Sequence, residues 1–327
     1  MAYATTTPSL RLAAAWGAPV VLGTEISDVA LLKRLRASAD FLAAVMTGLL
    51  PRIEGAASQP GWDGAPIRLV DSSMFAGPGR KGGQHRLHAS YDPVRRFFTS
   101  LEVSGVEKGE SLLHAGIEAG DIAVADRNFA KTPQLRALSE RRAFYAVRAG
   151  LHAVRMLDPV SGERLTSAAV LEALQTQDEV ELPVLLEEAK PAKADRSARA
   201  PVRLSARLII TRASAALKSR EEARIQRSRS RHGAEPTQET KNLAGVVLFL
   251  TNLPKEDWPI ARVGALYRLR WQIELAFKTL KSTFRMRDAP ANEPQLARTW
   301  ILANLIAALL AHLLVDAAER AVSPCAQ

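Results

Sequence analysis

The chain reads YRLRWQIELAFKTLK from Tyr267 to Lys281, and this stretch indicates the fold. At about 100° per helical residue, Tyr267, Arg270, Glu274 and Lys281 fall on a stripe about 60° wide. The spacing predicts one helix whose polar face carries a carboxylate flanked by two cations and a phenol. Such a face can hold a phosphodiester beside a metal ion. The alternative is a solvated face with ion pairs at helical spacing, chiefly Arg270 with Glu274. A neighbouring apolar arc would pack into a core, and its members are Leu269, Ile273, Ala276, Leu280 and Phe284.

Two further acidic residues follow short apolar runs. Asp71 comes after Ile67–Val70, and Asp126 comes after Ile122–Ala125. Each run is typical of a buried strand, which would put both carboxylates at the strand ends where open α/β sheets bind ligands. A single aspartate in such a place can also be a turn former or a helix cap. Together with Glu274, however, the two aspartates make a set of three carboxylates.

The spacing Tyr-x2-Arg-x3-Glu-x6-Lys resembles a motif of bacterial insertion-sequence transposases with an Asp-Asp-Glu (DDE) core. Within that group, the chain is similar to the YREK-motif subgroup, the insertion-sequence-four family. Leu250–Pro254 and Arg86–Asp92 also resemble the family, and the similarity runs from about Ala30 to Pro290. The chain departs from the family after each aspartate. Ser72-Ser73 replaces Gly-Thr, and Arg127-Asn128-Phe129 replaces Arg-Gly-Tyr.

The resemblance implies a metal-dependent catalytic site. By carry-over, Asp71 would bridge two Mg²⁺ ions, with Mn²⁺ as a substitute, while Asp126 and Glu274 would each hold one. Hard oxygen ligands suit Mg²⁺, and two such ions can activate the attacking oxygen and stabilise the leaving one. The catalytic and metal residues would therefore be Asp71, Asp126 and Glu274.

The resemblance also implies a DNA grip. Tyr267, Arg270 and Lys281 would hold phosphates by hydroxyl hydrogen bond, guanidinium fork and ammonium charge. Lys278 lies in the same stretch and is a further candidate. Trp258 and Trp271 could stack on a base extruded from the duplex, although Trp271 could equally be a core residue.

The function that follows is cut-and-paste DNA transposition. The enzyme would bind the inverted-repeat ends of an insertion sequence, nick one strand, cut the second through a hairpin, and join the element to target DNA. Pairing two ends calls for a homodimer in the DNA complex. We expect a cytoplasmic, nucleoid-associated protein with no membrane partner. The alternative is a catalytically silent, transposase-derived DNA-binding protein, which the short region before Asp71 would allow; a general metal nuclease is a third reading.

Composition agrees with a nucleic-acid partner. The 327 residues are enough for about two domains, and the net charge is +10. Lys190 to His232 holds 13 Lys or Arg and three acids, an excess equal to the whole net charge. This segment could position a DNA backbone or be a solvated basic loop. The single cysteine, Cys325, rules out an intrachain disulfide and fits a reducing compartment.

Neither a signal peptide nor a membrane span is expected. Met1 to Ser9 lacks a basic start and an apolar block. The longest apolar stretch, Trp300 to Val315, is short for a span, so we expect a buried C-terminal helix. His85 and His88 lack the further ligands of a zinc site, and Gly77 to Gly83 reads as a flexible basic loop.

The expected fold class is α/β, an RNase H-like core interrupted by a β-rich insertion subdomain, with helical N- and C-terminal segments. We expect five regions: 1–66, helical and a candidate for DNA binding; 67–157, the first part of the core; 158–251, a β-rich basic insertion; 252–290, the core helix with the catalytic Glu; and 291–327, a C-terminal helix. We expect one or two helices in 27–50, further helices at Gly109–Ala119 and Pro133–Arg141, and a polar, mobile stretch near Ser219–Lys241. The expected strands are Ile67–Val70, Arg86–Ser90, Phe97–Val103, Ile122–Ala125, Phe144–Arg148, Val180–Leu186, Arg203–Thr211 and Gly245–Thr251.

Overall fold

The computed structural model describes residues 9–17, 20, 23–56, 64–79, 82–188, 202–232, 235, 237–284, 286 and 288–322. Cys325 therefore lies outside the described residues, as do parts of the basic segment and of the 77–83 loop. The chain forms two compact units. The first comprises Met1–Glu110, His114–Gly116 and Trp271–Gln327, and the second comprises Ser111–Leu113 and Ile117–Arg270.

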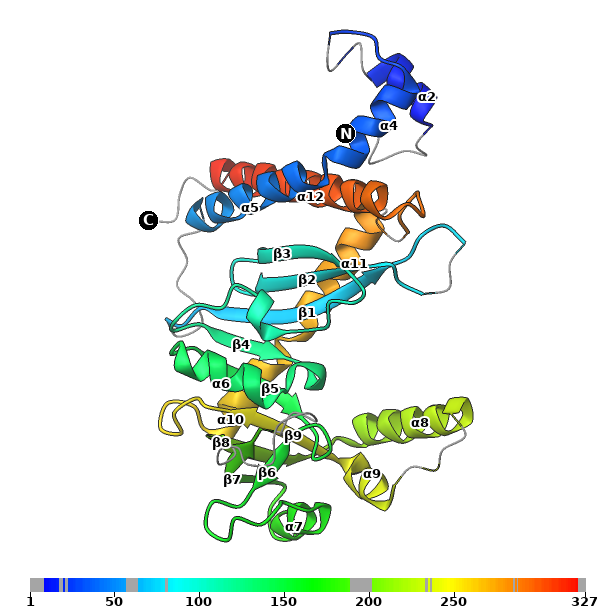
Figure 1. Cartoon of the computed structure of the whole chain (residues 1–327). Coiled ribbons are helices and arrows are strands. Elements are labelled where there is room, and N and C mark those ends of the chain that lie inside the picture. The colour runs from blue at the N-terminus through cyan, green and yellow to red at the C-terminus, as the bar shows by residue number, and fades with distance from the viewer. Residues whose placement is uncertain are drawn as a thin grey trace. The chain divides into compact units, whose positions relative to one another are not determined.

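The first unit is a three-stranded antiparallel sheet with helices. β2 lies between β1 and β3, and Asp71 of β1 pairs with Ala89 of β2, which pairs with Leu101 of β3. Helices α5 and α12 lie side by side along β3 (Figure 1). The elements of this unit are α2 (Leu10–Leu12), η1 (Ala13–Gly17), α4 (Asp28–Ala37), α5 (Ala39–Ala56), β1 (Ile67–Phe75), β2 (His85–Asp92), β3 (Phe97–Gly105), α11 (Trp271–Thr283) and α12 (Pro294–Val322).

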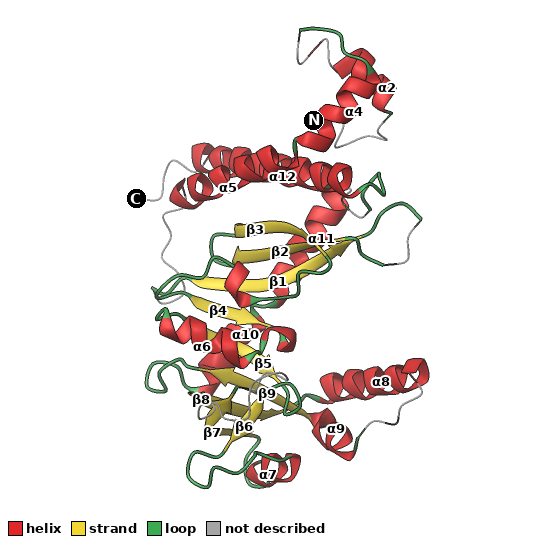
Figure 2. Ribbon diagram, viewed as in Figure 1, coloured by secondary structure: helices red, strands yellow, loops and turns green. Residues whose placement is uncertain are grey.

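The second unit contains a mixed sheet in the order β4-β5-β9-β8-β7-β6. Only β4 and β5 are parallel; the other pairs are antiparallel. Figure 2 shows helices beside these strands, among them α7, α8 and α9. The elements are β4 (Ile122–Ala125), η3 (Arg127–Phe129), α6 (Thr132–Glu140), β5 (Phe144–Ala149), β6 (Arg155–Leu157), α7 (Ser167–Ala173), β7 (Glu179–Glu187), β8 (Arg203–Arg212), α8 (Ala215–His232), α9 (Gln238–Asn242), η4 (Leu243–Gly245), β9 (Val246–Thr251) and α10 (Ile260–Arg268).

The α/β class is confirmed, and the predicted strands are all present within a few residues. The predicted N-terminal helices are also present: Ser27 caps α4 by accepting a hydrogen bond from the Ala30 N–H, and α5 follows directly. The predicted helix over Pro133–Arg141 is α6. Short-range apolar patterning was therefore sufficient to locate these elements.

The predicted helix over Gly109–Ala119 is wrong. Only η2 (Leu112–His114) forms there, a single turn. Gly116 has φ 62°, a left-handed conformation that a right-handed helix cannot contain. The Leu112 N–H instead donates to the side chain of Gln134, at 2.9 Å.

The polar stretch near 219–241 is also more regular than predicted. Most of it forms α8 and α9. Glu221 and Glu222 form helical-spacing ion pairs with Arg224 and Lys218 on α8. The described part of 158–251 therefore contains the helices α7, α8 and α9 as well as strands.

The C-terminal helix α12 includes Pro294–Val315, a segment long and apolar enough to cross a membrane by length and composition alone. One side of it is buried in the first unit, where Trp300, Ile301 and Leu305 are almost fully covered. Thr299 also donates to the Leu35 carbonyl, at 2.7 Å. This packing against protein is that of the core helix predicted from the sequence.

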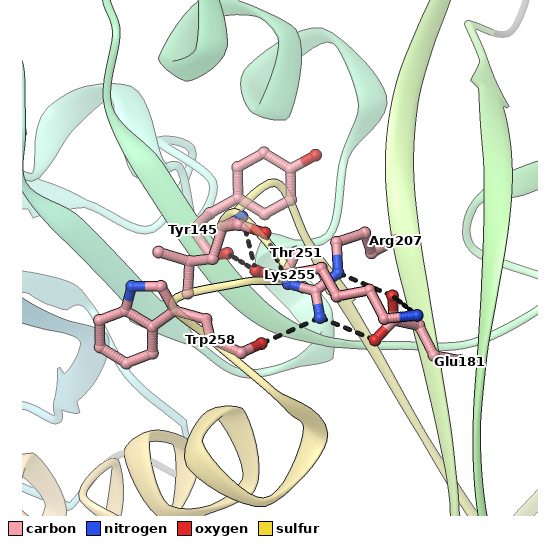
Figure 3. A network of polar contacts seen from close by, with 7 residues as sticks. Tyr145, Glu181, Arg207, Thr251, Lys255 and Trp258 are labelled. Atoms are coloured by element: carbon pink, nitrogen blue, oxygen red, sulfur yellow. Dashed lines mark hydrogen bonds and ion pairs between the residues drawn. The ribbon is translucent and has the colours of Figure 1, made fainter.

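A polar network in the second unit fixes the segment between β9 and α10 (Figure 3). Arg207 of β8 donates to both carboxylate oxygens of Glu181 on β7, at 3.1 and 2.7 Å. The same guanidinium donates to the carbonyls of Leu253 and Trp258. Lys255 reaches Glu181 as well, at 3.7 Å. One arginine thus holds the chain that leads into α10.

Asn252 ties the same segment to β5. Its side-chain oxygen accepts from the Tyr145 N–H, at 2.8 Å, and its amide nitrogen donates to the Ala143 carbonyl. Thr251 donates to the Tyr145 carbonyl, at 2.7 Å, and accepts from the Leu253 N–H. These contacts give a physical role to the Leu-Thr-Asn-Leu-Pro stretch, because it closes the end of β9 against β5.

We expect Arg207→Met to lower the free energy of unfolding by about 3 kcal/mol, because it leaves the largely buried Glu181 carboxylate without its main partner. The matched control is Arg203→Met on the same strand. Arg203 is 45% exposed and pairs with Glu187, so its loss should cost less than about 1 kcal/mol. Urea unfolding of both variants measures the difference, and equal losses would contradict the role given to Arg207.

Candidate active site

The motif stretch Tyr267–Lys281 is not one helix, as the sequence predicts, but two. α10 ends at Arg268 and α11 begins at Trp271. Between them the N–H groups of Leu269 and Arg270 bond to carbonyls three residues back, which tightens the chain into a turn. Tyr267 and Arg270 therefore belong to the second unit, whereas Glu274 and Lys281 belong to the first.

Asp71 lies within a strand and not at its end, contrary to the prediction. β1 continues to Phe75 because Ser72, Ser73 and Met74 stay paired with β2. The half-buried Asp71 carboxylate accepts from the Ser72 N–H, at 2.7 Å. Its side chain must share a face of the sheet with Phe75, since residues two apart in a strand point the same way.

Helix α11 packs on that same face. The Lys281 ammonium lies 5.2 Å from the centre of the Phe75 ring and donates to the Met74 carbonyl, at 3.1 Å. Phe277 stacks on Phe98 of β3, with ring centres 6.0 Å apart. Phe98 pairs with Tyr91 of β2, which is two residues from Ala89, the partner of Asp71. Cross-strand partners share a face, so both contacts put α11 on the Asp71 side.

Another carboxylate near β1 lies on the opposite face. Glu110 accepts a hydrogen bond from the Ser72 hydroxyl, at 2.6 Å, and pairs with Arg86, at 4.0 Å. Ser72 is adjacent to Asp71 in the strand, so the two side chains point to opposite faces. Glu110 therefore lies away from Asp71, and Glu274, in the first turn of α11, is exposed.

In the second unit, Asp126 directly follows β4. One of its carboxylate oxygens caps η3 by accepting from the Asn128 N–H, at 2.8 Å. The capping role that the sequence left open is therefore real, but it uses only one of the two oxygens. β4 runs parallel to β5, and Ala125 lies opposite Val147. The residues that follow this pair are Asp126 and Arg148, so the two lie close to each other.

Tyr267 and Arg270 gather at this strand end. The Tyr267 ring packs on Phe249 of β9, with ring centres 4.6 Å apart, and Phe249 pairs with Arg148. Burial raises the pKa of Tyr267 to about 12; Asp126 acts in the same direction, and Arg270 and Arg148 oppose it. These shifts show that Asp126, Arg148 and Arg270 all lie within electrostatic range of the phenol.

The other predicted DNA contacts differ in their exposure. Trp271 is 54% exposed, and Lys278 also faces solvent. Trp258 is only 6% exposed, and the Arg262 guanidinium lies 4.1 Å from its ring centre. Of the two tryptophans, Trp271 is therefore the one whose ring a base could reach.

Sequence reasoning missed Arg148 and Glu221. Arg148 occupies the end of an apolar run, the same signal that identified Asp126, and could have been found by it. Glu221 pairs with Arg127, at 3.6 Å, and with Arg224, at 2.6 Å. No short-range signal connects Glu221 to Arg127, because the pairing is made by the fold.

The predicted set of three carboxylates spans both units, since Asp126 is in the second and Asp71 and Glu274 are in the first. Among the described residues, no group of three or more His, Cys, Asp or Glu side chains is arranged to hold a metal ion. The donor chemistry nevertheless fits, because carboxylate oxygens are the ligands that Mg²⁺ prefers. The three-carboxylate site stays a prediction.

The raised pKa of Tyr267 makes a pH-dependence test possible. A folded-state pKa above the ordinary 10 means that the buried phenol stabilises the fold below about pH 10, and that this contribution is lost as pH rises toward 12. From pH 9 to 11 we expect Tyr267→Phe to lose about 1 kcal/mol less stability than the natural chain. Urea unfolding at both values measures it. An equal decline would contradict the burial of the phenol.

Comparison with known proteins identifies the family of this chain. Residues 62–310 match the family described as "Transposase DDE domain". The transposase of insertion sequence element IS186A from Escherichia coli is 37% identical over 95% of this chain and 81% of its own length. The Escherichia coli transposase for IS421 is 37% identical over 92% and 79%. The transposase for IS231E from Bacillus thuringiensis is 27% identical over 75% and 55%. The chain belongs to the DDE transposase family.

Proposed function

We propose that this protein is a DNA transposase that moves an insertion sequence by cut-and-paste transposition. The family match supports this, as do the names of the relatives, which are transposases for insertion sequence elements. The net charge of +10 suits a polyanionic partner. The single observation that carries the proposal is the packing of α11, the helix of the motif glutamate, on the Asp71 face of β1.

Glu274 would lie near Asp71 because two lengths are about equal. One is the length of α11 between Glu274 and Lys281, and the other is the length of β1 between Asp71 and Met74. Glu274, Phe277 and Lys281 share one side of α11, since they are three, four or seven residues apart. Lys281 contacts Met74, and helix and strand run in the same sense (Figure 1). Seven residues back along a helix and three back along a strand each cover about 10 Å. Starting from the Lys281–Met74 contact, the helix would therefore reach Glu274 at about the distance at which the strand reaches Asp71.

Asp71, Asp126 and Glu274 would hold the divalent ions, Mg²⁺ with Mn²⁺ as a substitute. Two bound ions would supply Lewis-acid activation of the attacking and leaving oxygens of the phosphodiester. Asp126 keeps one carboxylate oxygen outside its capping bond to Asn128, so a ligand role and the cap are compatible. The same capping bond orients the carboxylate before any ion arrives.

The second unit would supply the grip on the DNA end. Arg148 and Arg270 can hold phosphate oxygens by charge-assisted hydrogen bonds. The Tyr267 phenol remains protonated at neutral pH, because its pKa is about 12, and can donate to a phosphate. Trp271 is exposed enough to stack on a displaced base. Lys281 and Lys278 would add charge from the first unit, although Lys281 also anchors α11.

We also propose the YREK-motif subgroup, the RNase H-like core and the homodimer. The antiparallel β1–β2–β3 order and the parallel β4–β5 pair are what such a core contains. The five predicted regions stay part of this proposal. For the dimer, Leu314 and Val315 near the end of α12 are 73% and 57% exposed, an apolar surface that a second copy could cover.

The test is cleavage of plasmid DNA that carries the element's ends. We expect Glu274→Gln to bind the ends as the natural chain does but to cut them at least about a hundredfold more slowly with Mg²⁺, the loss of about 3 kcal/mol of transition-state stabilisation. The control is Glu25→Gln, an exposed carboxylate in the same unit, which should cut normally.

Full cleavage by Glu274→Gln would remove this residue from the proposed site. If the natural chain itself binds the ends but yields no product with Mg²⁺ or Mn²⁺, the catalytically silent DNA-binding protein is the correct reading. Cutting of unrelated DNA without joining would instead identify a general nuclease.

A further inference from the structure

A small pocket in the second unit adjoins the strand end that carries Asp126 and shares Arg148 with the site described above. Its volume is about 110 Å³, and its lining combines apolar residues with the side chains of Arg127, Arg148, His152, Glu221 and Arg224. Pockets for drug-sized ligands measure about 300–1,000 Å³, and one water molecule takes about 30 Å³. The pocket therefore has room for a group of a few heavy atoms, such as a phosphate, but not for a nucleoside.

The electrostatics of the pocket are those of an anion site. Burial lowers the pKa of Arg127, and Arg224 and Arg148 act in the same direction. Three guanidinium groups in one small volume repel each other, so the arrangement needs a negative charge to balance it. That charge comes from Glu221, which is 17% exposed and accepts two hydrogen bonds from Arg224, at 3.0 and 2.6 Å.

Glu221 belongs to α8, a helix in which basic residues outnumber acidic ones. Its carboxylate lies 3.6 Å from Arg127, a residue that the fold brings next to α8 from η3. Arg148 contributes to the field at the same carboxylate. The arginines thus come from three separate elements, η3, β5 and α8, and converge on one acidic side chain.

We propose that this pocket is a binding site for a backbone phosphate of DNA, and that the Glu221 carboxylate occupies its arginines until a phosphate displaces it. The proposal rests on the proposed function, because it takes DNA as the partner. A carboxylate and a phosphodiester both present oxygen acceptors to a guanidinium fork. In the protein without DNA, Glu221 therefore holds the arginines in position and offsets their positive charge.

Displacement has a distinctive salt dependence. A phosphate that meets a free cation releases a counterion from DNA, and the logarithm of affinity then falls with that of salt concentration by about 0.9 per contact. In the natural chain the phosphate must also displace Glu221 from the arginines, which offsets part of the favourable free energy of counterion release. Removing the carboxylate should therefore raise affinity and steepen the dependence on salt.

The first experiment compares Glu221→Gln with Glu222→Gln, binding a duplex oligonucleotide measured by fluorescence anisotropy from 0.05 to 0.3 M KCl. Both variants remove one acid from α8, but Glu222 is 54% exposed and pairs with Lys218. We expect Glu221→Gln to bind about fivefold more tightly than Glu222→Gln near 0.1 M salt, with a slope steeper by up to about one unit. Equal affinities and slopes in the two variants would overturn the proposal.

The second experiment removes a pocket cation. Arg148→Gln should make the slope about one unit shallower. The control Arg155→Gln removes an arginine that is 58% exposed and pairs with Glu187, and its slope should not change. Circular dichroism on both variants confirms folding. Equal slopes for Arg148→Gln and Arg155→Gln would overturn the assignment.

A third arm distinguishes the source of the phosphate. Inorganic phosphate replaces chloride at constant ionic strength during thermal unfolding. Stabilisation of the natural chain but not of Arg148→Gln, together with unchanged DNA binding by the variants, would identify a site for free phosphate and overturn the DNA assignment. Failure of the natural chain to bind any duplex would defeat the proposed function itself. Normal duplex binding without the expected variant differences would defeat the pocket alone.

Discussion

The packing of α11 on one face of β1 is the constraint on which the candidate site depends. A strand turns successive side chains to opposite faces, so Asp71 can meet only what covers the Phe75 side. Lys281 contacts both the Phe75 ring and the Met74 carbonyl. This lysine would therefore serve the site twice, as a cation near the DNA and as the anchor of the helix that carries Glu274.

In the second unit the corresponding constraint is strand register. Because β4 and β5 are parallel and β5 pairs with β9, Asp126, Arg148 and Phe249 come to one edge of the sheet. Tyr267 packs on Phe249 and brings the end of α10 to that edge. Arg207 of β8 and Asn252, which directly follows β9, keep the segment before α10 in place. The register of β4, β5 and β9 thus decides which of these residues come together.

The sequence predicted most of the sheet because strands such as Ile122–Ala125 are short apolar runs whose burial is a local property. It did not predict where β1 would end. The polar residues Ser72 and Ser73 indicated the end of the strand, but both pair with β2 and the strand continues through them. It also missed the break at Leu269 and Arg270, since helical spacing continues unchanged through a turn of this kind.

The charged residues of α8 show why part of the site could not be predicted. Their number indicated a mobile basic segment, yet Ala215–His232 contains neither glycine nor proline and forms a helix. Its pairing with Arg127 joins residues almost a hundred positions apart, and only the fold decides that. An acid placed among arginines lowers the cost of bringing those cations together before any ligand is present. The same acid would then compete with the proposed phosphate for these arginines.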